Sequence, residues 1–503
     1  MLRRWALVCV LGTAVAACGS GGPSYLRVTV TCDDPLVDLA LVESLTVRWT
    51  LDTVQPQVDV PVGDVLRDGS TSFVLQMPGG VTVTGLTAEG TGPGGAVLAT
   101  AAVDAVEVPG SGTRDVTLAL GAPAGPRPLT CTGGGAPTTF PTVRVTDALE
   151  HSKAESVTWM GTGWAVSFGD ARFNEPDKSR TDPMLALLAP DGTKLGDEVR
   201  VDDGWCYAAA SQVAWTGSRL AVAWYDCSPS PEGDNYDLMF RAFDASGAPL
   251  GPTKVLTQAV AQNENWRTGT LLWDGSRLVL ASAYLPGAGP DWQLVLWLLD
   301  EDGNLVDELR RLDSSGPDET LPALAYSGSG YALGFNVKEG AASVGRLLLL
   351  TPGGHATGGV FDIGVGNGLS LVWAGDRYVA GQVDATGTTP HLRLVSIGAD
   401  GSIGQPLVLP LTDLALGFVP LASTGSDLGA LVTYRTTESV VGVALQRYAA
   451  WLAPVGGATV VREEGAGAVS LLALGASPTG YGLAWSDDSA GNWEVFFAAV
   501  GCP

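Results

Sequence analysis

A unit of about 50 residues recurs through the second part of the chain, and this repeat constrains the fold more than any other feature. Each copy begins with an aliphatic residue, one further residue and an aromatic residue, followed by a glycine-containing turn and a second apolar run. The aromatic residues are Trp159, Trp215, Trp273, Tyr326 and Trp373, and the aligned residues of the last two copies are Ser423 and Ala476. Steps of 47 to 58 residues separate these seven positions.

Each copy continues into a third and a fourth apolar run, and a tight turn such as Asp191-Gly192 or Asp302-Gly303 joins the two. Four antiparallel strands in about 50 residues form one blade of a β-propeller. The copies therefore predict an all-β, seven-bladed β-propeller over residues 140–503, with six or eight blades as alternatives. In architecture this repeat resembles the WD-repeat and TolB-type propellers, although neither family's full motif is present.

The last copy stops after its third strand, near Val500. Residues 140–146 have the pattern of the fourth strand of the first copy, around Val199. We expect this early segment to complete the last blade, because such a closure removes the open sheet edges of the ring.

Residues 25–122 show a different pattern, in which apolar and polar residues alternate with period 2. LRVTVTC (26–32) and LTVRWTL (45–51) are two of about seven such runs, and turn residues separate them. This pattern predicts an N-terminal β-sandwich, immunoglobulin-like or fibronectin-like in architecture, with Trp49 in its core. A linker rich in glycine and proline follows at 123–139.

The chain begins with a basic pair, about a dozen apolar residues and the sequence VAAC at 15–18. This start resembles the lipobox signal of bacterial lipoproteins. The resemblance implies a signal peptide over 1–17, acylation of Cys18 and a tether over 18–24. It also implies a lipid-anchored protein of the cell envelope, at the outer membrane or the cell surface. The alternative is an ordinary secretory signal, with Cys18 an incidental thiol.

The formal net charge is −25, which becomes about −27 once Arg3 and Arg4 leave with the signal. A field of this sign repels phosphate backbones, so nucleic acid is not expected as a partner. Divalent cations and basic protein surfaces are compatible with the charge, although acidic surfaces also serve solubility alone.

Five cysteines remain after signal removal and lipidation, so at least one is not paired within the chain. Cys206 and Cys227 fall on loops that share one face of the same blade, and we expect them to form a disulfide. Cys502 follows the third strand of the last copy and Cys131 precedes the closing strand, which starts on the same face, so a bond between them would staple the ring closure. A bond from Cys32 to Cys131 is the alternative.

The longest loops fall on the face that carries the connections between blades, and they combine acidic and aromatic residues. Such a mixture suits calcium-assisted or stacking-based sugar binding, so calcium is the one cofactor to consider. The alternative is that these loops are solvated and that aromatic plugs fill them. The candidate ligand-face residues are Trp205, Asp226, Trp266, Asp487 and Asp488.

No nucleophile motif or zinc-binding motif accompanies the three histidines, so the sequence offers no catalytic residue to name. The first hypothesis is a membrane-anchored, non-catalytic binding module for a protein or a glycan. A propeller glycosidase or lyase is the second hypothesis, because glycoside hydrolysis needs only two carboxyl groups. An envelope-assembly scaffold is the third.

Overall fold

The computed structural model describes β-strands and their turns, with no helix among the described residues. These residues are 24–32, 44–51, 56–61, 70–77, 80–91, 97–120, 137–148, 150–173, 181–202, 208–227, 235–257, 265–286, 292–307, 310–312, 320–340, 342–387, 389–411, 418–425, 427–437, 440–449, 452–465, 467–489 and 491–502. The all-β class expected from the sequence is confirmed. Within this part of the chain no helix is long and apolar enough to cross a membrane. The expected signal peptide and Cys18 lie outside it.

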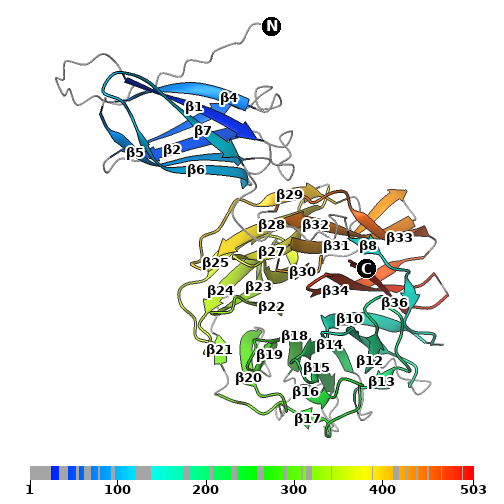
Figure 1. The fold of residues 1–503 in the computed structure, drawn as a ribbon. Coiled ribbons are helices and arrows are strands. Elements are labelled where there is room, and N and C mark those ends of the chain that lie inside the picture. The colour runs from blue at the N-terminus through cyan, green and yellow to red at the C-terminus, as the bar shows by residue number, and fades with distance from the viewer. Residues whose placement is uncertain are drawn as a thin grey trace. The chain divides into compact units, whose positions relative to one another are not determined.

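The chain divides into two compact units, Met1–Gly125 with Gln405–Leu407, and Pro126–Gly404 with Val408–Pro503. The first unit contains two sheets (Figure 1). One has the order β4-β1-β7, with β1 Ser24–Cys32, β4 Ser70–Met77 and β7 Gly112–Leu120. The other has the order β3-β2-β5-β6, with β2 Ser44–Thr50, β3 Gln57–Pro61, β5 Thr82–Thr91 and β6 Val97–Glu107.

The expected alternation places the core residues of this unit. In β2 every second residue is buried, namely Leu45, Val47 and Trp49, while Arg48 between them is exposed. Since successive side chains of a strand point to opposite faces, one face of the sheet is buried and the other is solvated.

The second unit is a succession of antiparallel sheets whose strands follow one another in chain order. The first strands are β10 Ser152–Trp159, β14 Ala208–Trp215, β18 Asn265–Trp273, β22 Thr320–Tyr326, β26 Asn367–Trp373, β30 Leu421–Ser423 and β34 Val469–Ser477. The second strands are β11 Trp164–Asp170, β15 Leu220–Cys227, β19 Leu278–Leu285, β23 Tyr331–Glu339, β27 Arg377–Asp384, β31 Asp427–Thr437 and β35 Gly480–Asp487. The third strands are β12 Asp182–Leu188, β16 Tyr236–Phe243, β20 Gln293–Leu299, β24 Ala342–Leu350, β28 His391–Gly398, β32 Val440–Ala449 and β36 Glu494–Gly501. The fourth strands are β13 Val199–Arg200, β17 Lys254–Val255, β21 Arg310–Leu312, β25 Phe361–Val365, β29 Leu407–Pro410 and β33 Thr459–Gly465.

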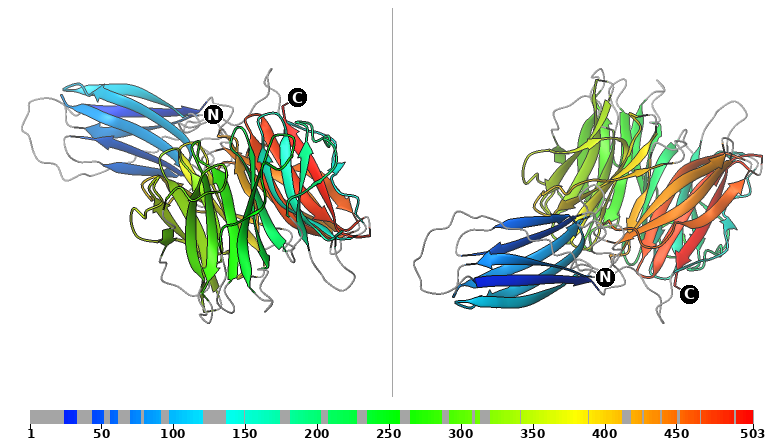
Figure 2. Two further views of the ribbon diagram at one scale, coloured as in Figure 1. Left: turned by 90° about the horizontal axis from the view of Figure 1, so that it is seen from below. Right: turned by 90° about the horizontal axis from the view of Figure 1, so that it is seen from above.

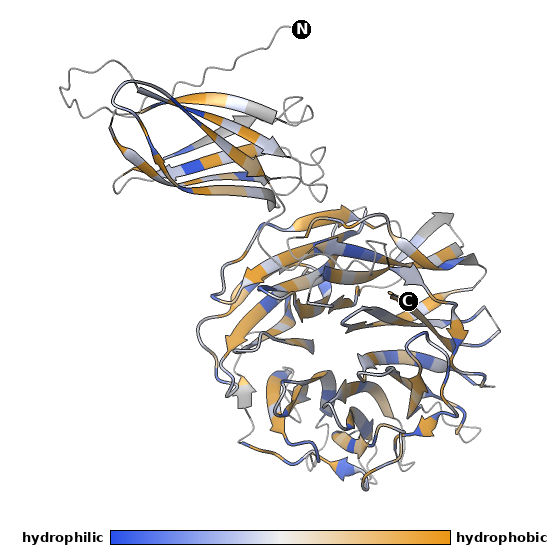
Figure 3. Cartoon of the chain, viewed as in Figure 1, coloured by the Kyte–Doolittle hydropathy of each residue, from blue (hydrophilic) through white to orange (hydrophobic). Residues whose placement is uncertain are grey.

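These sheets stand side by side around a ring (Figures 1 and 2). The first strand of each sheet contacts the first strand of the next, and β34 contacts β10. Hydrophobic residues run along the strands of the ring (Figure 3), and every residue of β11 is buried. The expected β-propeller class is therefore confirmed for this unit.

The ring closes between the two ends of its own sequence. Strand β36 pairs with β8 (Thr138–Thr139) and β9 (Val143–Arg144), in the registers Val500↔Thr139 and Phe497↔Val143. The predicted completion of the last sheet by an early segment is confirmed. Pairing begins at Thr138, two residues before the expected domain start, so the end of the expected linker belongs to the sheet.

The repeat aromatics lie at the ends of the first strands, where each packs on the neighbouring core. Trp159 contacts Trp164 edge-on with ring centroids 4.8 Å apart, and Trp373 contacts Tyr378 in the same way at 4.8 Å. Both tryptophans are partly buried against a hydrophobic cluster. The recurring aromatic position of the sequence is thus a packing position.

Candidate functional site

One end of each sheet carries the connection between its second and third strands and the connection to the next sheet. We call this end of the ring the loop face. At the loop face the last residue of the second strand pairs with the first residue of the third strand. Three sheets that are neighbours around the ring carry an acidic pair here, at the terminal position in two sheets and one position further in, next to Cys227↔Tyr236, in the third, and all six side chains are buried. The pairs are Asp170↔Asp182, Asp226↔Asp237 and Asp487↔Glu494.

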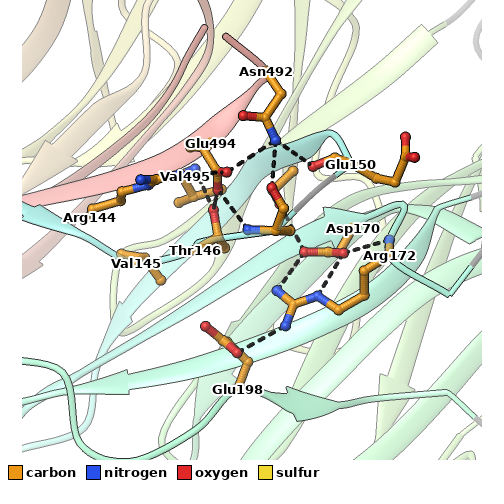
Figure 4. Close-up of polar contacts among 12 residues, drawn as sticks. Arg144, Val145, Thr146, Glu150, Asp170, Arg172, Glu198, Asn492, Glu494 and Val495 are labelled. Carbon is orange, nitrogen blue, oxygen red and sulfur yellow. Dashed lines mark hydrogen bonds and ion pairs between the residues drawn. The ribbon is translucent and has the colours of Figure 1, made fainter. Parts of the chain in front are cut away.

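The carboxylate of Glu494 holds the ring closure together (Figure 4). It accepts hydrogen bonds from the Arg144 guanidinium at 2.8 Å and from the Thr146 hydroxyl. Thr146 in turn accepts a hydrogen bond from the Val495 amide at 2.9 Å. Because Arg144 and Thr146 belong to the closing segment, this carboxylate stabilises the closed ring and is not free for a ligand.

Asp487 and Asp488 also stabilise the fold locally. The Asp487 carboxylate forms an ion pair with Arg462 and accepts a hydrogen bond from the Ser489 amide at 2.7 Å. Asp488 accepts one from the Ala468 amide at 2.5 Å. Among the described residues no group of three acidic, histidine or cysteine side chains could hold a metal ion, so these residues gain no support as a calcium site.

Asp170 and Glu198 bind the guanidinium of Arg172 from two sides (Figure 4). The Nε and Nη2 atoms of Arg172 donate to Asp170 at 2.9 and 2.7 Å, and Nη1 donates to Glu198 at 3.1 Å. Ser152 donates a further hydrogen bond to Asp170 at 2.8 Å. Burial alone would raise the pKa of Glu198, but Lys194 and Arg172 outweigh burial and lower it.

Asp182 and Asp202 share the guanidinium of Arg200. Its Nη2 atom lies 3.0 Å from Asp182, and its Nε atom donates to Asp202 at 2.8 Å. Burial, followed by the Asp182 carboxylate, raises the pKa of Asp202 to about 6. Oδ2 of Asp202 is buried and makes no hydrogen bond within the described part of the chain.

Asp226 has an exposed fraction of 0% and belongs to the same group of carboxyls. Burial and then the Asp202 carboxylate raise its pKa to about 7. A ligand therefore cannot reach Asp226 directly, although the sequence placed it on the ligand face. The raised pKa of Asp226 is thus caused by its packing inside the sheet and by the neighbouring Asp202 carboxylate.

Trp266 also differs from the expectation. Its exposed fraction is 6%, and its ring stacks on Tyr284 with a centroid distance of 4.3 Å. It contacts Trp297 edge-on at 5.6 Å and belongs to a hydrophobic cluster. The β18–β19 and β19–β20 pairings bring these three rings together, so Trp266 lies in the core rather than on a ligand face. Trp205 lies outside the described residues.

The loop face presents two aromatic rings that each lie next to an arginine, and sequence reasoning missed both. Phe173 is 47% exposed, and the Arg200 guanidinium lies 4.6 Å from its ring centroid. The Arg267 guanidinium lies 4.4 Å from the ring centroid of the partly buried Trp292. Each arginine lies on a strand more than 20 residues from its ring in sequence, and both rings lie outside the strands, so no local motif could have found the pairs.

Cys227 and Cys502 are both disulfide-bonded. The partners expected for them, Cys206 and Cys131, lie outside the described residues. The pairing therefore stays a prediction, as does the alternative bond from Cys32.

The fold and the loop face define an all-β protein with a β-propeller unit. No protein-family model and no curated protein matches the sequence. Similar solved structures include the β-propeller domain of the Trilobed protease from Pyrococcus furiosus, with a TM-score of 0.42 and 10% identity over 70% of this chain and 96% of that one.

Two further similar structures are sialidase-type proteins. Trypanosoma rangeli sialidase has a TM-score of 0.44 and 9% identity, over 72% of this chain and 59% of that one. The N10 neuraminidase-like protein of A/little yellow-shouldered bat/Guatemala/060/2010 has a TM-score of 0.39 and 12% identity, over 72% and 99%. The chain thus spans little more than half the length of the sialidase, and at such scores these likenesses assign no activity to it.

Proposed function

We propose that this protein is a non-catalytic binding module of a bacterial cell envelope, acting through the loop face of its propeller. In this proposal the ring has seven blades, and the first unit is an immunoglobulin-like or fibronectin-like sandwich. Disulfides join Cys206 to Cys227 and Cys131 to Cys502. A lipid on Cys18 anchors the chain to the outer membrane or the cell surface, with residues 18–24 as the tether.

The burial of the acidic residues at the loop face supports a binding function rather than a catalytic one. A catalytic carboxyl must reach its substrate. Yet Asp226 and Glu494 are buried, and Glu494 is bound to the closing segment. The exposed feature is Phe173 beside Arg200, which suits binding by contact.

A glycosidase is the second candidate, and it would require the buried carboxyls of Asp202 or Asp226, whose pKa values are raised to about 6 and about 7, to become accessible to a substrate. A proton held near neutral pH is what a general acid needs. A hydrolysis assay of wild type against Asp226→Asn on envelope and host polysaccharides separates the two functions. Hydrolysis by the wild type that the variant loses would establish the enzyme.

Binding itself is tested by thermal shift of the mature chain against calcium and a panel of glycans. A ligand at about 100 times its Kd adds about 2.7 kcal/mol of stability. No shift with any compound would leave a protein as the ligand, to be sought by cross-linking on intact cells. No shift and no cross-linked partner would contradict the binding proposal.

The anchor is tested separately. Cells that incorporate labelled palmitate should label the wild-type chain and not Cys18→Ser, and the variant should leave the membrane fraction. Equal membrane association of the two chains would contradict the anchor.

A further inference from the structure

One exposed aromatic ring of the loop face is held in a fixed orientation. Phe173 is 47% exposed and follows Arg172 directly in the chain. A freely mobile ring would lose rotational freedom on binding, whereas a ring already held by its surroundings loses little. The contacts around Phe173 therefore decide what the ring can do.

The first set of contacts fixes the backbone beside Phe173. The amide of Arg172 donates to Asp170 at 2.8 Å, and its guanidinium binds Asp170 and Glu198. Asp170 is itself buried at the end of β11. The residue that precedes Phe173 is thus tied to the sheet by both its backbone and its side chain.

The second set of contacts covers one side of the ring. The Arg200 guanidinium lies 4.6 Å from the ring centroid, within the range of a cation–π contact. Asp182 and Asp202 hold this guanidinium from two directions. One face of Phe173 thus rests on a fixed planar cation.

The surroundings of Phe173 differ from the core of a protein interface, which is a contiguous apolar patch. In its sheet, among the described residues, the other exposed large hydrophobic residue is Leu195, which lies in the β12–β13 hairpin at the opposite end. The Phe173 ring contacts the guanidinium of Arg200, and the residue before it in the chain is Arg172; both arginines are bound by acids. An isolated ring among fixed planar polar groups matches the surface of a sugar, which has one apolar face and a rim of hydroxyls.

We propose that Phe173 is a stacking platform for the apolar face of a pyranose ring. This inference rests on the binding function proposed above and names its ligand class. The guanidinium under Phe173 draws the electron density of the ring toward itself, which disfavours a cationic ligand on the free face. Because the formal net charge of −25 also disfavours an anionic ligand, we infer a neutral glycan.

The probes are cellohexaose, mannohexaose and hexa-N-acetylchitohexaose, all of them neutral, titrated into the full mature chain by calorimetry. We expect at least one to bind, and Phe173→Ala to weaken that binding about tenfold, the scale of one aromatic contact with its buried area. Phe173→Trp should retain the affinity. Leu195→Ala, a truncation of similar exposure at the opposite end, should leave it unchanged.

Each other outcome overturns the inference. A hexasaccharide that binds Phe173→Ala as well as wild type would remove Phe173 as the platform and leave the binding function standing. No binding by any of the three would overturn the ligand class. If Phe173→Ala instead loses a cross-linked protein partner, the ring belongs to a protein interface. Thermal unfolding of each variant checks that the fold is retained.

Discussion

The phenol of Tyr481, in the second strand of the last sheet, donates a hydrogen bond to the buried carboxylate of Asp427 in the preceding sheet. Arg447 binds the same carboxylate through Nε at 2.7 Å. An equivalent contact recurs at another boundary, where Tyr331 donates to Asp274 at 2.5 Å. Neighbouring sheets of the ring are thus joined by a tyrosine that reaches back to an aspartate, in addition to their apolar contacts.

Removing the Tyr481 hydroxyl should therefore weaken the ring. We expect Tyr481→Phe to lower the free energy of unfolding by about 1–3 kcal/mol, because a buried charged acceptor loses a partner. Tyr326→Phe is the matched control, since the Tyr326 hydroxyl bonds an exposed carbonyl at 3.0 Å. Urea unfolding measures both. Equal, small losses in the two variants would show that the Asp427 contact adds nothing.

The closure makes a second prediction. Glu494→Ala removes the buried carboxylate that Arg144 and Thr146 share and leaves Arg144 only its exposed ion pair with Asp147, so the closing segment should loosen and the free energy of unfolding should fall by about 1–3 kcal/mol. Hydrogen exchange at the amides of Phe140 and Val145, which bond Ala499 and Val495, should speed up. Glu463→Ala removes an exposed carboxylate and serves as the control. Unchanged protection at Phe140 and Val145 would contradict the role of Glu494.

Stability should depend on pH through Asp202 and Asp226. Both pKa values are raised in the folded state, to about 6 and about 7, from 3.8. Between the unfolded pKa of 3.8 and the folded pKa values, the folded chain holds protons that the unfolded chain has released. The free energy of unfolding therefore falls as pH rises from about 4 to about 7. Above pH 7 both carboxyls are charged in both states, and their contribution to the slope ends.

The test compares unfolding at pH 5.5 and pH 8. Wild type should be less stable at pH 8, and Asp226→Asn should reduce that difference because the amide does not titrate. Asp488→Asn, whose carboxyl is outside this group, should keep the wild-type slope. A wild-type stability that is flat or rises over this range would refute the assignment.

The sequence predicted the parts of this structure that periodicity controls. A 50-residue repeat with an aromatic position and glycine turns specifies sheets in succession, and the pattern at 140–146 specified the closure. The sequence alone did not show that Asp226 and Trp266, expected on the ligand face, are buried. Whether an acid or a ring at a strand end faces solvent depends on strands distant in sequence, such as those that bring Tyr284 beside Trp266. The Phe173–Arg200 contact has the same origin, because it joins two segments that only the sheet brings together.

The last prediction concerns glycines in the connections between third and fourth strands. Gly303 has a φ of +78°, which an L side chain rarely adopts, and a Cβ atom there would lie 2.2 Å from the Phe240 ring of the preceding sheet. Gly456 has a φ of +68° in the connection between the third and fourth strands of another sheet, four residues beyond the position equivalent to Gly303, and nothing lies within 4 Å of its Cβ position. The two glycines thus separate backbone strain from packing between sheets.

We expect Gly456→Ala to cost about 1 kcal/mol, the penalty of the backbone alone. Gly303→Ala should cost a further 1–3 kcal/mol, roughly the price of forcing an atom into a packed core. Phe240→Leu in the Gly303→Ala background should recover part of this loss, because the smaller side chain makes room for the methyl group. Urea unfolding of the three variants and of Phe240→Leu alone completes the cycle. Equal losses for the two glycine variants would show that the hairpin does not need close contact with the neighbouring sheet.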